Sequence, residues 1–69
     1  MTYKPHQQRV VDEKSELDDK LTKLIAFIGE SPIYKTLDPV EQELLKLQGD
    51  TMGCYSDILG KRIAAFQIE

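Results

Sequence analysis

Side chains that could carry out acid–base or nucleophilic chemistry occur singly in this sequence. His6 is the only histidine and Cys54 the only cysteine, so neither has a partner of its own kind for catalysis or metal binding. The segments GDTMG and LGKR lack the spacing of a phosphate-binding GxxxxGK[ST] loop. We therefore expect no catalytic residue, no bound metal ion and no cofactor, in a protein that is not an enzyme.

The acidic side chains are numerous but have the pattern of a solvated helix surface. The segment DEKSELDD predicts ion pairs four residues apart, Glu16 with Lys20 and Asp19 with Lys23. The formal net charge of −3 disfavours a long nucleic-acid polymer, because binding to one rewards a basic surface. A small anion held by a local cluster of cations is still allowed.

The basic side chains fall into separate groups along the chain. Arg9 lies near the start of a predicted first helix, Lys20 and Lys23 lie in its second half, and Lys61 and Arg62 lie near the end of a predicted second helix. In an antiparallel hairpin Arg9 would neighbour Lys61 and Arg62, whereas the two lysines would lie roughly 16–21 Å further along. Those lysines could join such a cluster only from another chain. The alternative for each cation is an exposed, solubilising charge.

The first helix is predicted over about residues 5–28. Pro5 suits the first helical position, and apolar residues recur on one face at Val10, Leu17, Leu21, Leu24 and Ile28. Gly29 is suited to a left-handed C-terminal cap, and Pro32 disfavours continuation of the helix.

A linker over residues 29–38 and a second helix over about 39–66 complete the predicted hairpin. In the linker, Ile33, Tyr34 and Leu37 should cover the closed end. The segment DPVE predicts the second helix start, with Asp38 as N-cap in a capping-box pattern. Small residues follow along this helix at helical spacing, and they indicate either close helix packing or room for a flat ligand: Gly49, Gly53, Ser56, Gly60 and Ala64.

The length of the chain, 69 residues, limits how such a hairpin can be stabilised. A chain of this size buries only about 60% of its unfolded surface, and a single cysteine allows no internal disulfide. The lone thiol fits a reducing cytosol, where we expect Cys54 to be a partly buried apolar side chain. The predicted fold is all-α: one domain over residues 1–69, an antiparallel hairpin of two long helices that assembles into a homo-oligomeric helical bundle.

The segment MTYKPHQQRV lacks the apolar core of a signal peptide. The longest apolar run, LIAF, is far shorter than the roughly 20 residues of a membrane span. We therefore expect a soluble protein that does not bind membranes.

Over about residues 5–66 the sequence resembles the small phage proteins that act as anti-CBASS cyclic-nucleotide sponges. CBASS is a bacterial defence in which cyclic oligonucleotides activate a killing effector. The resemblance lies in the order and spacing of QRVVDEK, LDDKLTKL, the set Met52, Tyr55, Ile58 and Leu59, and the set Arg62, Ile63 and Phe66. It implies an all-helical hexamer in the host cytoplasm that binds cyclic dinucleotides between two subunits and cyclic trinucleotides in separate pockets built by three, without cleaving them.

The resemblance also implies ligand-binding residues. Lys20 matches the lysine that contacts dinucleotide phosphate, Thr22 matches a position of the trinucleotide pocket, and Arg62 matches the arginine that holds phosphates there. The base-stacking aromatic of the family falls on Pro5 or His6 here, so His6 or the preceding Tyr3 would have to replace it. The remaining expected ligand residues are Arg9 and, if the alignment shifts by one, Lys61.

Two other functions fit the pattern. A non-catalytic coiled-coil adaptor that binds a protein partner would explain the apolar stripes equally well, but it gives Lys20 and Arg62 no role. An accessory protein that binds nucleic acid is disfavoured by the net negative charge.

Overall fold

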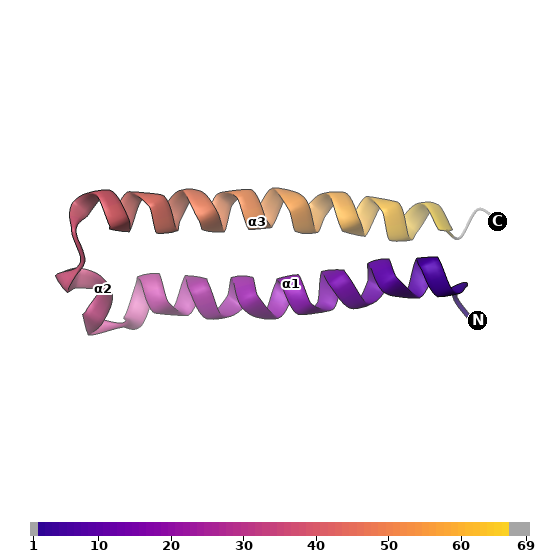
Figure 1. Cartoon of the computed structure of the whole chain (residues 1–69), viewed down its shortest axis with the longest axis horizontal. Helices are drawn as coiled ribbons and strands as arrows, with labels where there is room; N and C mark the ends of the chain where they lie inside the picture. Colours follow the sequence, from indigo (N-terminus) through magenta and orange to yellow (C-terminus); the bar gives the residue numbers. More distant parts are fainter. Residues whose placement is uncertain (1, 67–69) are drawn as a thin grey trace.

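Two long antiparallel helices joined by a short one make up the fold. The computed structural model describes residues 2–66 and orders them as α1 (Pro5–Glu30), α2 (Pro32–Thr36) and α3 (Pro39–Phe66). Figure 1 shows α1 and α3 side by side along their whole length, with the start of α1 and the end of α3 at one end of the molecule and α2 at the other. The rod measures 49 × 15 × 15 Å. The predicted all-α hairpin of two long helices is confirmed.

α1 packs against α3 through a repeat with alternating steps of three and four residues. Its half-buried and buried positions include Val10, Leu17, Leu21, Leu24 and Ile28. Lys14 occupies the gap between Val10 and Leu17 in the same repeat and is also half-buried. The inner face of α1 is therefore apolar except at the buried Gln7 and at Lys14.

The end of α1 differs from the prediction. The helix continues through Gly29 to Glu30 and ends at Ser31, whose backbone amide donates to the Phe27 carbonyl at 3.1 Å. Neither a glycine nor any other described residue has a positive φ. The left-handed cap predicted at Gly29 is wrong, because extended backbone at Ser31 ends the helix instead.

The segment predicted as a linker also contains a helix. Ser31 is its N-cap, with Oγ accepting from the Ile33 amide at 3.2 Å, and Pro32 takes the first helical position. This Ser-Pro pair is a helix start signal, so Pro32 not only disfavours continuation of α1, as predicted, but also begins α2. α2, about one and a half helical turns long, reverses the direction of the chain between α1 and α3.

Side chains from three elements hold the closed end together. Tyr34 is buried and meets the Phe27 ring edge-on, with centroids 6.1 Å apart. Gln42 Nε2 donates to the carbonyls of Tyr34 at 3.1 Å and of Leu37 at 3.0 Å, and so satisfies groups that the end of α2 leaves open. Tyr34 thus covers this end as predicted, whereas Ile33 is exposed.

α3 begins as the sequence predicts and approaches α1 closely at two glycines. The Val40 amide donates to Asp38 Oδ1 at 2.8 Å, which makes Asp38 the N-cap. A Cβ atom at Gly49 would lie 3.6 Å from Leu24, and one at Gly60 would lie 3.4 Å from the Lys14 side chain. Close packing therefore accounts for these two glycines, while Gly53 faces open space.

The interior of this rod is small. Among residues 2–66 the buried hydrophobic side chains are Val10, Tyr34 and Leu59, and Leu59 alone is fully buried. Large apolar side chains remain exposed on the surface: Ile25, Ile33, Val40, Leu44, Leu47, Tyr55 and Ile58. Cys54 is exposed rather than partly buried, contrary to the prediction. Within the described part of the chain, no helix combines the length and hydropathy that a membrane span requires.

We predict that Leu59→Ala lowers the free energy of unfolding by roughly 2–5 kcal/mol, because it removes the one side chain that is fully enclosed. Ile33→Ala is the control, since Ile33 is 62% exposed and its truncation should change stability by less than about 0.5 kcal/mol. Urea unfolding followed by circular dichroism measures both. Equal losses in the two variants would contradict this assignment of the core.

Candidate ligand-binding surface

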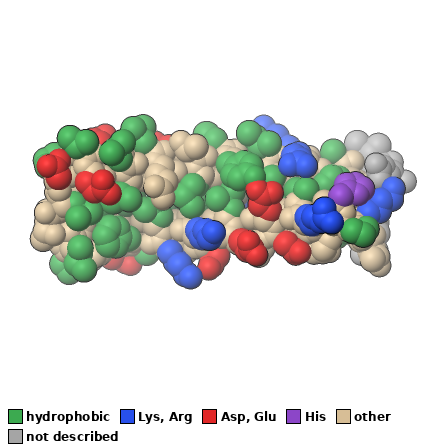
Figure 2. Space-filling view, viewed as in Figure 1, with side chains coloured by type: hydrophobic (Ala, Val, Ile, Leu, Met, Phe, Trp, Pro, Cys, Tyr) green, Lys and Arg blue, Asp and Glu red, His purple; other side chains and the backbone are tan. Residues whose placement is uncertain are grey.

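Six of the residues predicted to bind ligand lie at the open end of the hairpin. The Tyr3 ring meets the Phe66 ring edge-on, with centroids 6.3 Å apart, which ties the start of the described chain to the end of α3. Tyr3 is half-buried there. The other members of the group are exposed: Pro5, His6, Arg9, Lys61 and Arg62. Figure 2 shows the histidine beside Lys and Arg side chains at this end.

The other two predicted residues lie elsewhere. Lys20 and Thr22 are exposed in the second half of α1, and Lys20 is 15 residues from Pro5, or roughly 22 Å along the helix. Thr22 Oγ1 donates to the Asp18 carbonyl at 2.9 Å. Its oxygen can still accept a hydrogen bond from a ligand. One chain therefore brings together the residues of the open end but does not join Lys20 and Thr22 to them.

The lysines of α1 differ in whether they already have a partner. Lys14 pairs with Asp18 at 2.9 Å and Lys23 pairs with Asp19 at 3.2 Å, as predicted for the second pair. Within residues 2–66 Lys20 forms no ion pair, so the predicted Glu16–Lys20 pair is wrong. Arg62 forms none there either. These two cations keep their charge available to an anion.

Arg62 lies near a hydrogen bond that crosses the hairpin. The Tyr55 hydroxyl donates to the Glu13 carboxylate, and this bond raises the pKa of Tyr55, helped by desolvation and by the Glu13 charge. The positive charge of Arg62 acts on the same hydroxyl in the opposite direction. Arg62 therefore acts electrostatically on a residue of its own helix, seven positions earlier in α3.

A polar network crosses the hairpin where Lys14 interrupts the apolar face of α1. Lys14 Nζ donates to Asp18 Oδ2 at 2.9 Å and to Ser56 Oγ at 2.8 Å, and the buried Ser56 hydroxyl donates to Asp18 Oδ1. Gly60 leaves the room that the lysine stem occupies. Sequence reasoning missed this network, although a lysine at a core position of the repeat, opposite a line of small residues, was a signal for it.

This network changes the acidity of Asp18. The hydrogen bond from Ser56 is the largest cause that lowers the pKa of Asp18 below its ordinary value of 3.8, followed by the hydrogen bond from Lys14. Both favour the ionised carboxylate. Because the folded pKa is below the unfolded one, the network stabilises the fold above pH 4 and loses that effect as the pH falls through the folded pKa.

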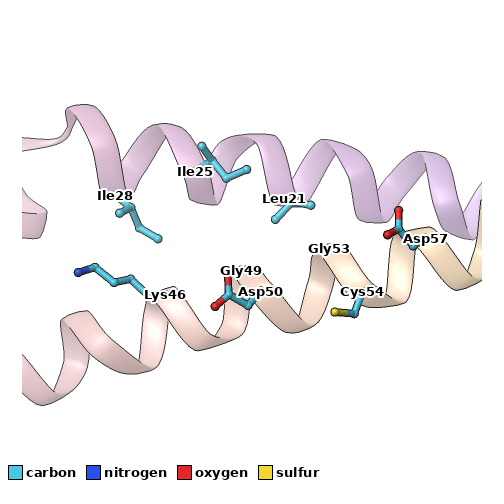
Figure 3. A pocket seen from close by; sticks show the side chains of 9 residues that line it. All are labelled: Leu21, Ile25, Ile28, Lys46, Gly49, Asp50, Gly53, Cys54 and Asp57. Atoms are coloured by element: carbon cyan, nitrogen blue, oxygen red, sulfur yellow. The ribbon is translucent and has the colours of Figure 1, made fainter.

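A groove of about 760 Å³ runs between α1 and α3 on another side of the rod. Figure 3 shows apolar side chains of α1 above the α3 backbone, with Asp50 and Asp57 on the α3 side. The lining consists of Leu21, Ile25, Ile28, Lys46, Gly49, Asp50, Gly53, Cys54 and Asp57. None of the predicted ligand residues belongs to it, and its two aspartates disfavour a phosphate. Residues 2–66 contain no group of three or more metal-ligating side chains.

Comparison with known proteins identifies the family of this hairpin. The Sequestin family matches residues 4–65, which is nearly the whole chain. The chain belongs to the Sequestin family. Sequestin is the name of the anti-CBASS sponge family, so the resemblance found in the sequence is confirmed.

A relative of this Sequestin chain is encoded by a phage. The sequence is 42% identical over 62 residues to an uncharacterized 7.5 kDa protein of the denB–rIIB intergenic region of Enterobacteria phage T4. The match covers 90% of this chain and 95% of the phage protein. No solved structure matches the chain significantly. All the predicted ligand residues except Tyr3 fall inside the Sequestin match.

We predict that Asp18→Asn weakens the dependence of stability on pH between about pH 2 and 6, since it removes the carboxylate whose pKa the network lowers. Asp19→Asn is the matched control, because Asp19 pairs with Lys23 on the exposed surface. Urea midpoints measured across this range should fall less steeply with acid for Asp18→Asn than for the control. The same slope in both variants would contradict the role given to the network.

Proposed function

We propose that this protein is a phage sponge that sequesters cyclic oligonucleotide messengers in the host cytoplasm and so inhibits CBASS defence. Its ligands would be cyclic dinucleotides such as 3′,3′-cyclic GMP–AMP and cyclic trinucleotides, bound intact by a homo-oligomer, a hexamer by analogy with the family. Membership of the Sequestin family over residues 4–65 carries the proposal. It gives no role to a nucleic-acid polymer, a membrane or a cofactor.

The placement of the cations supports the proposal. Lys20 and Arg62 are exposed and form no ion pair within residues 2–66, although Lys14, Lys23 and Lys46 each have an acidic partner. An unpaired ammonium or guanidinium can accept a phosphate without first losing an internal partner.

The distance between Lys20 and the cations of the open end gives a reason for assembly. The open end of one hairpin carries Arg9 and Arg62, whereas Lys20 lies roughly 22 Å from the start of the helix. Cyclic oligonucleotides are compact, so a neighbouring chain has to supply the missing cations. Three or more charge-assisted contacts of about 1.5–3 kcal/mol each, together with burial of bases between subunits, are compatible with submicromolar affinity after the cost of association.

We predict that 3′,3′-cyclic GMP–AMP or a cyclic trinucleotide raises the melting temperature of the protein by several degrees, because a ligand that binds only the folded state stabilises it. Differential scanning fluorimetry with a panel of cyclic di- and trinucleotides measures the shift, with linear dinucleotides as controls. Ligand recovered intact after long incubation separates a sponge from a nuclease. If no cyclic nucleotide shifts the melting temperature, the coiled-coil adaptor becomes the better proposal.

We predict that Lys20→Ala weakens binding of cyclic dinucleotides and that Arg62→Ala weakens binding of cyclic trinucleotides. Loss of one charge-assisted phosphate contact of about 1.5–3 kcal/mol corresponds to roughly 10- to 150-fold in Kd. Calorimetric titration measures each affinity, and light scattering checks that the variants keep their mass.

Matched controls come from cations outside the set predicted to bind ligand. Lys23→Ala is the control for Lys20, because Lys23 is 77% exposed and already paired with Asp19. Lys35→Ala on α2 is the control for Arg62. Wild-type affinity in both test variants would contradict the site assignment. Loss of trinucleotide binding in Lys61→Ala instead of Arg62→Ala would move the phosphate contact to Lys61.

A further inference from the structure

A hydrogen bond between the two long helices engages an acidic side chain beside residues predicted to bind phosphate. The Tyr55 hydroxyl, on α3, donates to the Glu13 carboxylate, on α1. Tyr55 is 41% exposed, so this bond lies at the surface of the rod. Neither the buried core nor the groove between the helices includes Tyr55, and packing therefore does not account for its hydroxyl.

Two cations are candidates for an ion pair with Glu13. Arg9 lies four positions earlier on α1, the spacing at which side chains of opposite charge neighbour each other on a helix. Arg62 lies on α3, and its charge acts on the same Tyr55 hydroxyl that donates to Glu13. Within residues 2–66, however, Glu13 forms an ion pair with neither arginine. Its carboxylate is bonded to a neutral donor, and both guanidinium groups are without an acidic partner in that part of the chain.

The neutral partner of this carboxylate matters for an anion site. A guanidinium that is already paired with a carboxylate has to lose that pair before it binds a phosphate. A carboxylate that approaches the bound phosphate also repels it. A tyrosine hydroxyl, in contrast, satisfies a carboxylate oxygen without neutralising any cation. The bond from Tyr55 to Glu13 therefore preserves positive charge at this end of the hairpin.

We propose that Tyr55 is a positioning residue of the phosphate-binding site: by holding the Glu13 carboxylate, it keeps Arg9 and Arg62 available to the phosphates of a cyclic oligonucleotide. This role rests on the proposed sponge function, because it concerns the phosphates of the same ligand. Tyr55 acts through Glu13 and does not have to touch the nucleotide itself.

Calorimetric titration with cyclic tri-AMP tests this role. Tyr55→Phe removes the hydroxyl and lets Glu13 pair with an arginine, so the affinity should fall by roughly 2- to 5-fold for each such pair that the ligand has to break. Glu13→Gln removes the competing charge and should bind at least as tightly as the wild type. The double variant, Tyr55→Phe with Glu13→Gln, should recover wild-type affinity, although it still lacks the tyrosine hydroxyl.

Tyr34→Phe is the matched control. It also removes a tyrosine hydroxyl that donates a hydrogen bond, in this case to the Gln42 carbonyl at 3.3 Å, but it does so at the closed end of the hairpin. It should keep wild-type affinity. Equal affinities of Tyr55→Phe and the wild type would overturn the role of Tyr55. A loss that Glu13→Gln does not restore would overturn it too, since that loss would come from the structural effect of the missing bond.

A measurement without nucleotide separates this role from the proposed function. Nuclear magnetic resonance of carbon-13-labelled tyrosine follows the ionisation of Tyr55. Glu13→Gln should lower the pKa of Tyr55 and Arg62→Gln should raise it, because Glu13 raises this pKa and the Arg62 charge lowers it. If neither variant moves the pKa, the proposed role is wrong, whatever the protein binds. If the pKa responds but the wild type does not bind cyclic tri-AMP, the proposed function fails while the placement of Glu13 by Tyr55 stands.

Discussion

Two helices lying side by side can bury only one face each, and this constraint shapes the whole molecule. The shared seam encloses Leu59 completely and little else. Among residues 2–66, large apolar side chains outside the seam such as Ile25, Leu44 and Leu47 stay in contact with water in a single chain. The proposed assembly would let further copies cover those surfaces and bring the separated cations together.

The seam itself is not uniformly apolar. Lys14, Asp18 and Ser56 form a hydrogen-bonded network across it, with Gly60 leaving space for the lysine. A polar network of this kind fixes which residues of the two helices face each other, because a shift of one helix would leave its members without partners. At the closed end, Gln42 has a similar role by bonding two carbonyls of the turn. The hairpin therefore has a defined register partway along its seam and at its closed end.

The helices were predictable from the sequence because their apolar repeats and the Asp38 cap are local signals. The end of α1 was not, since glycine also fits ordinary helical backbone and Ser31 supplied the stop. α2 was missed because Pro32 was interpreted only as a helix breaker. The network around Lys14 was missed because it depends on Ser56, which lies 42 positions away in the chain.

For the candidate site, the sequence could indicate which residues bind ligand but not how they are arranged in space. Lys20 and Arg62 were chosen through the family resemblance, and the structure adds that both are exposed and without an ion pair within residues 2–66. Glu16 was expected to neutralise Lys20 and does not. The arrangement of several chains around a ligand depends on contacts between copies, and a local sequence pattern does not encode their geometry.

The central claim is that ligand binding belongs to an assembly and not to one hairpin. Sedimentation velocity with a cyclic dinucleotide, followed at 260 nm across a dilution series of the protein, tests it most directly. The account predicts that nucleotide absorbance sediments only with species heavier than the 7.9 kDa chain and is released when dilution dissociates them. Nucleotide that sediments with a single chain, at an affinity unchanged by dilution, would contradict it.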